Sequence, residues 1–202
     1  MSFIKVISPE EATGRLDKIY QQVKSPEGQV DNVLQIHSLR PHTLVGHMGL
    51  YKAALHHSGN VLPEWFLEAV GVVVSRLNRC DYCARHHTEG LKRLLKTSSL
   101  DCESYISALA KAAPGEPFTV REQRGLAYAR KLTREPGKIV AEDIELLRAS
   151  GFDDGELLEL NQVAAYFAYA NRTVSGLGVN IEGELLGQSP PTGDDDSNWS
   201  HG

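Results

Sequence analysis

The sequence has few of the features that would place it outside a reducing, aqueous compartment. It has three cysteines in 202 residues and no apparent signal peptide, so we expect a cytoplasmic protein. No apolar run is long enough to span a bilayer. A formal net charge of -5 without a basic stripe argues against nucleic acid or an anionic membrane as a partner.

Nucleotide-binding signatures are also absent. Neither a GxGxxG motif nor a P-loop lysine motif occurs, so any nicotinamide must be oxidised elsewhere. Apolar residues are plentiful: 41% of the chain is hydrophobic and 23% is charged, which is enough to bury a good core as one domain or two small ones.

Helix signals recur along the chain, and no comparable set of alternating strands appears. Residues 8–11 have the serine, proline and glutamates of a capped start and predict a helix running towards Val23. Thr119 and Glu122 predict a second capped start. The sequence therefore predicts an all-α fold. The other helices are expected over 41–57, 63–77, a cysteine-bearing stretch ending near 97, 101–112, 119–134, 141–149 and 154–176.

We expect one domain over residues 1–185, with a motif core at about 40–97 and a helical second half over 101–180. Residues 186–202 contain two adjacent prolines and a run of aspartates and predict a flexible polar tail, with Trp199 as its anchor.

A cluster of reactive side chains lies near the middle of the chain. Cys83 follows Cys80 by three positions and His87 follows it by seven, so on a helix the three fall within an arc of about 60°. Two thiols at this spacing can form a reversible disulfide, and an imidazole beside a thiol can take its proton or stabilise the thiolate. The spacing therefore predicts a redox site in which Cys83 and His87 touch.

The surroundings of the cysteines add to this prediction. Asn78 is expected to cap the helix, which would put both cysteines in its first turn and a half, where the helix dipole favours a negative sulfur. Glu68 lies in an apolar stretch that predicts a buried helix, and a buried carboxylate needs a partner. His87 is the expected one, held by Glu68 in a fixed tautomer.

Glu68, Cys80, Cys83 and His87 together resemble a known signature. Eleven residues separate Glu68 from Cys80, two separate Cys80 from Cys83, and three separate Cys83 from His87. This spacing resembles that of the alkylhydroperoxidase D-like proteins of the carboxymuconolactone decarboxylase superfamily, particularly the peroxidase-related branch. One position departs from the pattern: the best-known members have a histidine where this chain has Tyr82. A phenol is a poor proton shuttle at neutral pH, so the relay is expected to run through water or to be weaker.

The resemblance implies a compact, all-helical bundle with the two cysteines at the N-terminal end of a central helix, and a homo-oligomer. It also implies a peroxidase that reduces hydrogen or organic hydroperoxides. By motif position, Cys83 is the peroxidatic thiol, Cys80 is the resolving thiol, and Glu68 and His87 form the proton relay. No bound cofactor is implied; an external dithiol of the lipoyl or thioredoxin type, carried by a reductant protein, would regenerate the thiols.

Other interpretations of the cluster stay open. A general disulfide reductase or redox sensor would use the same cysteines, whereas a decarboxylase-like enzyme would not need them. A zinc site would require Cys102 or His86 to complete it. His86 should point away from the cluster, because it is about 100° from His87 around the helix. Four histidines before Glu68 are expected to be surface or packed residues, unless one lines the entrance to the thiol pocket: His42, His47, His56 and His57.

Overall fold

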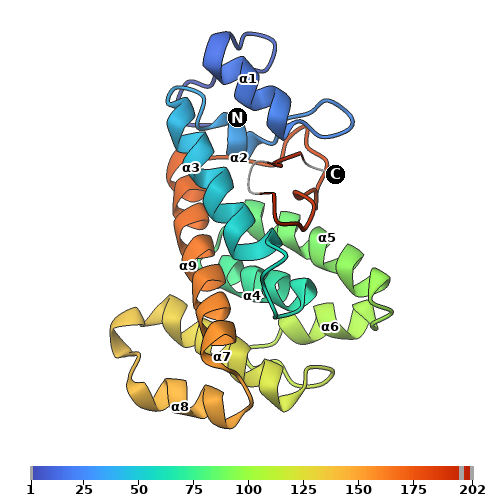
Figure 1. Cartoon of the computed structure of the whole chain (residues 1–202), viewed down its shortest axis with the longest axis vertical. Helices are drawn as coiled ribbons and strands as arrows, with labels where there is room; N and C mark the ends of the chain where they lie inside the picture. The colour runs from blue at the N-terminus through green and yellow to red at the C-terminus, as the bar shows by residue number, and fades with distance from the viewer. Residues whose placement is uncertain (1, 196–197, 201–202) are drawn as a thin grey trace.

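The computed structural model describes residues 2–195 and 198–200, and the regular elements of these residues are all helical (Figure 1). The predicted all-α fold is confirmed. No helix in this part of the chain is both long and apolar enough to cross a membrane. The elements are α1 Gly14–Val23, α2 Asn32–Gln35, α3 Pro41–Tyr51, the π-helical turn η1 Lys52–His56, α4 Glu64–Leu77, α5 Asp81–Thr97, α6 Cys102–Leu109, α7 Val120–Arg134, the 3-10 turn η2 Pro136–Lys138, α8 Ala141–Ala149 and α9 Asp154–Leu177.

The first helix begins later than its sequence signals predict. Ser8 and Glu11 do exchange reciprocal backbone-to-side-chain hydrogen bonds of 3.3 Å, but these close an isolated turn. The chain is then extended at Thr13 and left-handed at Gly14, where φ is +60°, so the turn cannot continue into α1. The capping box predicted at Thr119 is present, with Glu122 closing it.

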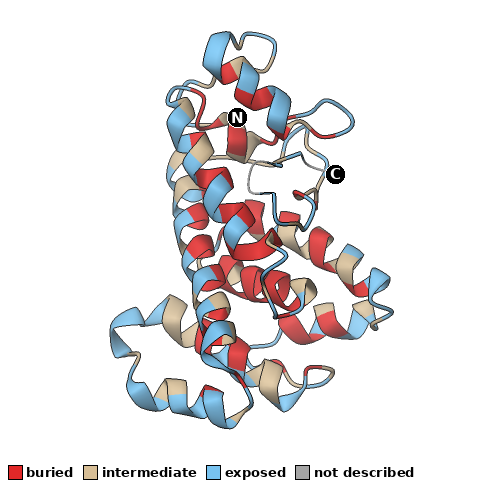
Figure 2. Ribbon diagram, viewed as in Figure 1, coloured by how far each residue is buried: buried red, intermediate tan, exposed pale blue. Residues whose placement is uncertain are grey.

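Helix α4 forms the centre of the molecule and packs against α5, α7 and α9 (Figure 1). Its ten consecutive residues from Phe66 to Ser75 are all buried, as Figure 2 shows for the interior of the bundle. A helix that is apolar nearly all round is stable only when neighbours cover every face. The burial of this segment agrees with the sequence prediction, and it carries the Glu68 carboxylate into the core.

The close approach of α4 and α9 depends on Gly71. A Cβ atom at this position would lie 2.2 Å from the ring of Phe167, which is fully buried and edge-on to His87 with ring centroids 4.5 Å apart. We expect Gly71→Ala to destabilise the protein by about 1–3 kcal/mol through overpacking, measured by urea unfolding. Gly49→Ala, on an open face of α3, is the control and should be neutral or stabilising. Equal stability of the two variants would contradict this packing argument.

The segment after α9 folds back onto the bundle. Gly187, at φ +83°, packs so closely on α5 that a Cβ atom would lie 2.8 Å from the backbone nitrogen of Gly90. The buried Lys52 ammonium donates to the Pro191 carbonyl at 2.5 Å, and the Gly193 N–H donates to the His56 carbonyl at 3.0 Å.

These contacts hold the described part of the expected flexible tail against the bundle. Trp199 also packs on the hydrophobic core. Residues 196–197 and 201–202 of that tail lie outside the described residues, and the domain boundary at 185 stays a prediction.

Candidate active site

The two thiols lie where α4 turns into α5. Cys80 is the N-cap residue of α5 and Cys83 lies in its first turn; both are reduced and buried, with their sulfur atoms 3.1 Å apart. The prediction that Asn78 caps this helix is wrong. Asn78 keeps helical backbone angles and ends α4, because its N–H still donates to the Val74 carbonyl, and Arg79 then reverses the chain at φ +56°.

Asn78 instead contributes to a polar link between helices. Its side chain donates to the Asn171 side chain of α9 at 2.9 Å, and Asn171 in turn donates to Ser75 of α4 at 3.0 Å. Asn171 also hydrogen-bonds with the Cys83 thiol, which favours ionisation of that thiol. The link fixes the cysteine turn against both α4 and α9. The sequence held no local signal for Asn171.

The two thiols differ in acidity. The hydrogen bond with Cys83 lowers the pKa of the Cys80 thiol to about 6; the Cys83 backbone, Ser175 and His87 act in the same direction, and burial opposes them. The same bond with Cys80, together with burial, raises the pKa of Cys83 well above its usual value. At neutral pH the two sulfur atoms therefore share one proton, and their hydrogen bond favours the thiolate on Cys80.

The two thiols also differ in access. Cys83 lines a cavity of about 40 Å³, whereas Cys80 is not among its lining residues. A water molecule needs roughly 10–15 Å³ of such volume, so the cavity has room for about three or four waters. The lining comes mainly from α2, α3, α4, α5, α9 and the segment after α9: Asp31, Val33, Leu34, His47, Tyr51, Glu68, Tyr82, Cys83, His86, His87, Gly90, Tyr166, Ala170, Gly187, Gln188 and Ser189.

Glu68 and His87 meet inside this cavity. The Glu68 carboxylate, on α4, lies 2.7 Å from Nδ1 of His87, and both side chains are largely buried. A carboxylate accepts, so Nδ1 carries the proton and Nε2 is left for other chemistry. No hydrogen bond joins His87 to either thiol within the described residues, so the expected contact with Cys83 is not a direct bond. Cavity space is available for a water or a substrate oxygen near both groups.

Aromatic side chains close another wall of the cavity. Tyr51 and Tyr166 stack with centroids 5.2 Å apart, and burial raises the pKa of both well above the usual value, so both stay phenols. His47 packs near them and also lines the cavity. Of the four histidines considered from sequence, His47 is therefore the one beside the thiol pocket, while His56 pairs with Glu64 at 2.7 Å.

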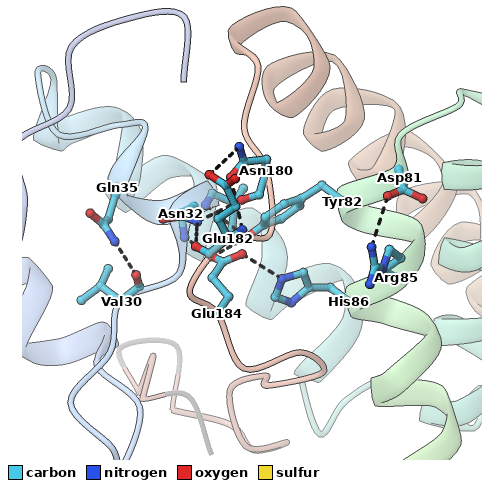
Figure 3. Close-up of polar contacts among 11 residues, drawn as sticks. Val30, Asn32, Gln35, Asp81, Tyr82, Arg85, His86, Asn180, Glu182 and Glu184 are labelled. Carbon is cyan, nitrogen blue, oxygen red and sulfur yellow. Dashed lines mark hydrogen bonds and ion pairs between the residues drawn. The ribbon is translucent and has the colours of Figure 1, made fainter. Parts of the chain in front are cut away.

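Glu184, which sequence reasoning missed, brings a second carboxylate to the site (Figure 3). It accepts hydrogen bonds from the Tyr82 hydroxyl at 2.9 Å and from Nε2 of His86 at 3.2 Å. The prediction that His86 points away from the site is wrong. The cavity runs along a wide stripe of α5 that includes Tyr82, Cys83, His86 and His87, so neighbouring histidines both reach it.

Cys102 takes no part in this arrangement. It begins α6 and packs against a different hydrophobic cluster from the one around Cys80 and Cys83. Across residues 2–195 and 198–200, no group of three or more histidine, cysteine or acidic side chains is arranged to hold a metal ion. The site offers thiols, imidazoles and carboxylates.

No family model and no curated protein matches the chain, but solved structures do. An uncharacterized peroxidase-related protein from Silicibacter sp. TM1040 is 25% identical, with a TM-score of 0.68, and the match covers 83% of this chain and 86% of that one. An uncharacterized peroxidase-related protein from Ralstonia eutropha JMP134, described as an alkylhydroperoxidase AhpD core, is 21% identical with a TM-score of 0.73, over 92% and 97%.

A third structure comes from a protein with another described activity. A cysteine-to-alanine variant of the debrominase Bmp8, in complex with 2,3,4-tribromopyrrole, is 16% identical with a TM-score of 0.65, over 91% of this chain and 95% of that one. This likeness concerns the fold. The structural neighbours include alkylhydroperoxidase D-like, peroxidase-related proteins, which supports the resemblance drawn from the four motif residues.

Proposed function

We propose that this protein is a thiol-dependent peroxidase that reduces hydrogen peroxide or organic hydroperoxides through a Cys80–Cys83 dithiol/disulfide cycle. The observation that carries the proposal is the contact of two reduced thiols, 3.1 Å apart, one of which lines a small cavity that also holds a buried Glu68–His87 pair. Thiolates are the nucleophiles that attack peroxides, and a carboxylate-held imidazole moves the protons that this reaction requires.

In the first step Cys83 attacks the peroxide. Its proton has two acceptors: the Cys80 thiolate in contact with it, or Nε2 of His87 through a cavity water. The sulfur–oxygen bond forms as the oxygen–oxygen bond breaks, and the departing hydroxide or alkoxide takes up a proton. Cys83 becomes a sulfenic acid, oxidised by two electrons, and the peroxide is reduced to water or an alcohol.

In the second step Cys80 resolves the sulfenic acid. The Cys80 sulfur bonds to the Cys83 sulfur as the sulfur–oxygen bond breaks. The proton taken from Cys83 in the first step passes from Cys80 or His87 to the leaving hydroxide, so that water and a disulfide remain. The sulfurs need to approach by only about 1 Å, because a disulfide bond is about 2.05 Å long. An external dithiol, of the lipoyl or thioredoxin type and carried by a partner protein, then restores both thiols.

Peroxide turnover tests the proposed function. The reduced protein should consume tert-butyl hydroperoxide continuously with dihydrolipoamide as the electron donor, and Cys102→Ala should do the same. Reduction of a model disulfide without peroxide consumption would instead support a general disulfide reductase. Lack of both activities would favour a function that does not use the dithiol, as in a decarboxylase-like enzyme.

The acidity of the pair gives a separate prediction. In a Cys102→Ala background we expect one thiolate per subunit to appear through about pH 6, since the pKa of Cys80 is lowered to about that value, and the second thiolate to require strongly alkaline pH. Thiolate ultraviolet absorbance measures both steps. Cys83→Ala, which removes this hydrogen bond, should move the first midpoint upward, towards the ordinary cysteine value of about 8.5. A midpoint already near that value with both cysteines present would contradict the assigned hydrogen bond.

A further inference from the structure

Two adjacent histidines of α5 enter the cavity with the same arrangement. Nδ1 of His87 is held by Glu68 at 2.7 Å, and Nε2 of His86 is held by Glu184 at 3.2 Å. Both carboxylates are buried, with side-chain exposures of 3% and 5%. Within the described residues the other ring nitrogen of each histidine has no hydrogen-bond partner. The cavity therefore contains two imidazoles, each held by its own carboxylate.

The Glu184 carboxylate is fixed by donors from three directions (Figure 3). The backbone N–H of Asn32 and the hydroxyl of Tyr82 both donate to it, in addition to His86. Tyr82 itself accepts from the Val33 N–H at 3.2 Å, and its ring stacks on His86 with centroids 4.5 Å apart. The acid and the imidazole are therefore both held in one orientation, as a group that transfers a proton at a fixed place requires.

Tyr82 does not itself supply a proton relay. Burial raises the pKa of its phenol well above the usual value, and the nearby Glu184 adds to this effect. Its hydroxyl donates to Glu184, so the residue that departs from the family pattern acts as a support for the His86–Glu184 pair. His86 follows Tyr82 by one turn of α5 and carries the next imidazole along the same face of the helix.

We propose that His86 is a catalytic residue that donates the proton to the leaving oxygen of the peroxide, and that Glu184 is its positioning residue. This assignment rests on the proposed peroxidase function. The reaction takes one proton from the Cys83 thiol and places one on the departing hydroxide or alkoxide. His87 and Cys80 are placed for the first transfer, and His86 for the second. When the oxygen–oxygen bond breaks, the imidazolium of His86 loses its proton to the leaving oxygen and becomes neutral, and a proton from solvent restores the imidazolium before the next turnover.

Leaving-group chemistry separates this role from a structural one. Hydroxide is a poor leaving group without a proton, whereas the acetate released from peracetic acid is stable as an anion. Loss of a general acid should therefore slow the reaction with hydrogen peroxide and have little effect on the reaction with peracetic acid. A damaged cavity should slow both reactions alike.

The experiment measures single-turnover oxidation of the pre-reduced full-length protein by each oxidant. His86→Gln keeps an N–H donor for Glu184 but cannot supply an acidic proton. Glu184→Gln keeps an oxygen that accepts from Tyr82 and Asn32 but lacks the negative charge that stabilises an imidazolium. This second variant tests the same proposal if His86→Gln does not fold. Arg85→Ala is the matched control on α5, because Arg85 is exposed, pairs with Asp81 and lies outside the cavity.

We expect His86→Gln to slow oxidation by hydrogen peroxide by about tenfold to a hundredfold and oxidation by peracetic acid by less than about threefold, with Glu184→Gln changing the rates in the same sense. Arg85→Ala should match wild type. Equal losses with both oxidants, or no loss with hydrogen peroxide, would overturn the assignment of His86. Wild-type protein that neither oxidant converts to the disulfide would overturn the peroxidase proposal itself, a result that differs from either outcome for the variants.

Discussion

Cys83→Ser is expected to abolish peroxide turnover, whereas Cys80→Ser should consume about one peroxide per subunit and then stop as a sulfenic acid. The reason is access: Cys83 lines the cavity and Cys80 does not. The Cys80→Ser reaction should also be slower than the first turnover of wild type, because the variant lacks the thiolate that contacts Cys83 and can accept its proton.

Peroxide consumption and mass spectrometry after a sulfenic acid trap distinguish the two variants. The lowered pKa of Cys80 supports the opposite assignment, in which Cys80 attacks the peroxide, because the more acidic thiol is the more ionised one at neutral pH. If Cys83→Ser forms the trapped sulfenic acid and Cys80→Ser is inert, then Cys80 is the attacking thiol and the roles of the two cysteines are exchanged.

Glu68→Gln is expected to lower turnover by about tenfold to a thousandfold, the size typical of a lost proton-transfer contribution. An amide of the same volume still accepts the hydrogen bond from Nδ1 of His87, so we expect near-normal melting. What the variant loses is the charge that supports a protonated imidazole. Steady-state peroxide assays and thermal unfolding measure the two effects independently.

The same helix provides a matched control. Glu64, on α4, also holds a buried histidine, His56, at 2.7 Å, but neither residue lines the cavity. Glu64→Gln should therefore keep its peroxidase activity. Equal activity losses in the two variants would mean that a buried carboxylate–imidazole pair serves the fold in both places. Full activity of Glu68→Gln would remove Glu68 from the proton path.

Local signals in the sequence predicted the parts of the structure that depend on near neighbours. The capped start at Thr119 and the buried apolar helix around Glu68 are both properties of short segments, and the structure forms the corresponding helices. The Asn78 prediction failed at this same scale, because asparagine is compatible with either end of a helix and a tertiary contact with Asn171 decided between them.

The rest of the site depends on contacts between distant segments. Glu184 follows Tyr82 by 102 residues and lies in a segment without helical periodicity, so nothing in its local sequence marks it as part of the site. The cavity itself is formed jointly by several helices and the chain after α9. The resemblance drawn from the motif marked Tyr82 as a departure from the pattern, but the use of that position as a support for Glu184 emerges only from the packing of the C-terminal segment.

The most direct test of the dithiol mechanism is an equivalence titration of the pre-reduced wild-type protein with hydrogen peroxide, in the absence of any reductant. We expect about one equivalent of peroxide to disappear per subunit, two thiols to be lost, and peptide mapping to find a Cys80–Cys83 disulfide with Cys102 still reduced. Peroxide that persists beside intact Cys80 and Cys83 thiols, or oxidation confined to Cys102, would contradict the mechanism.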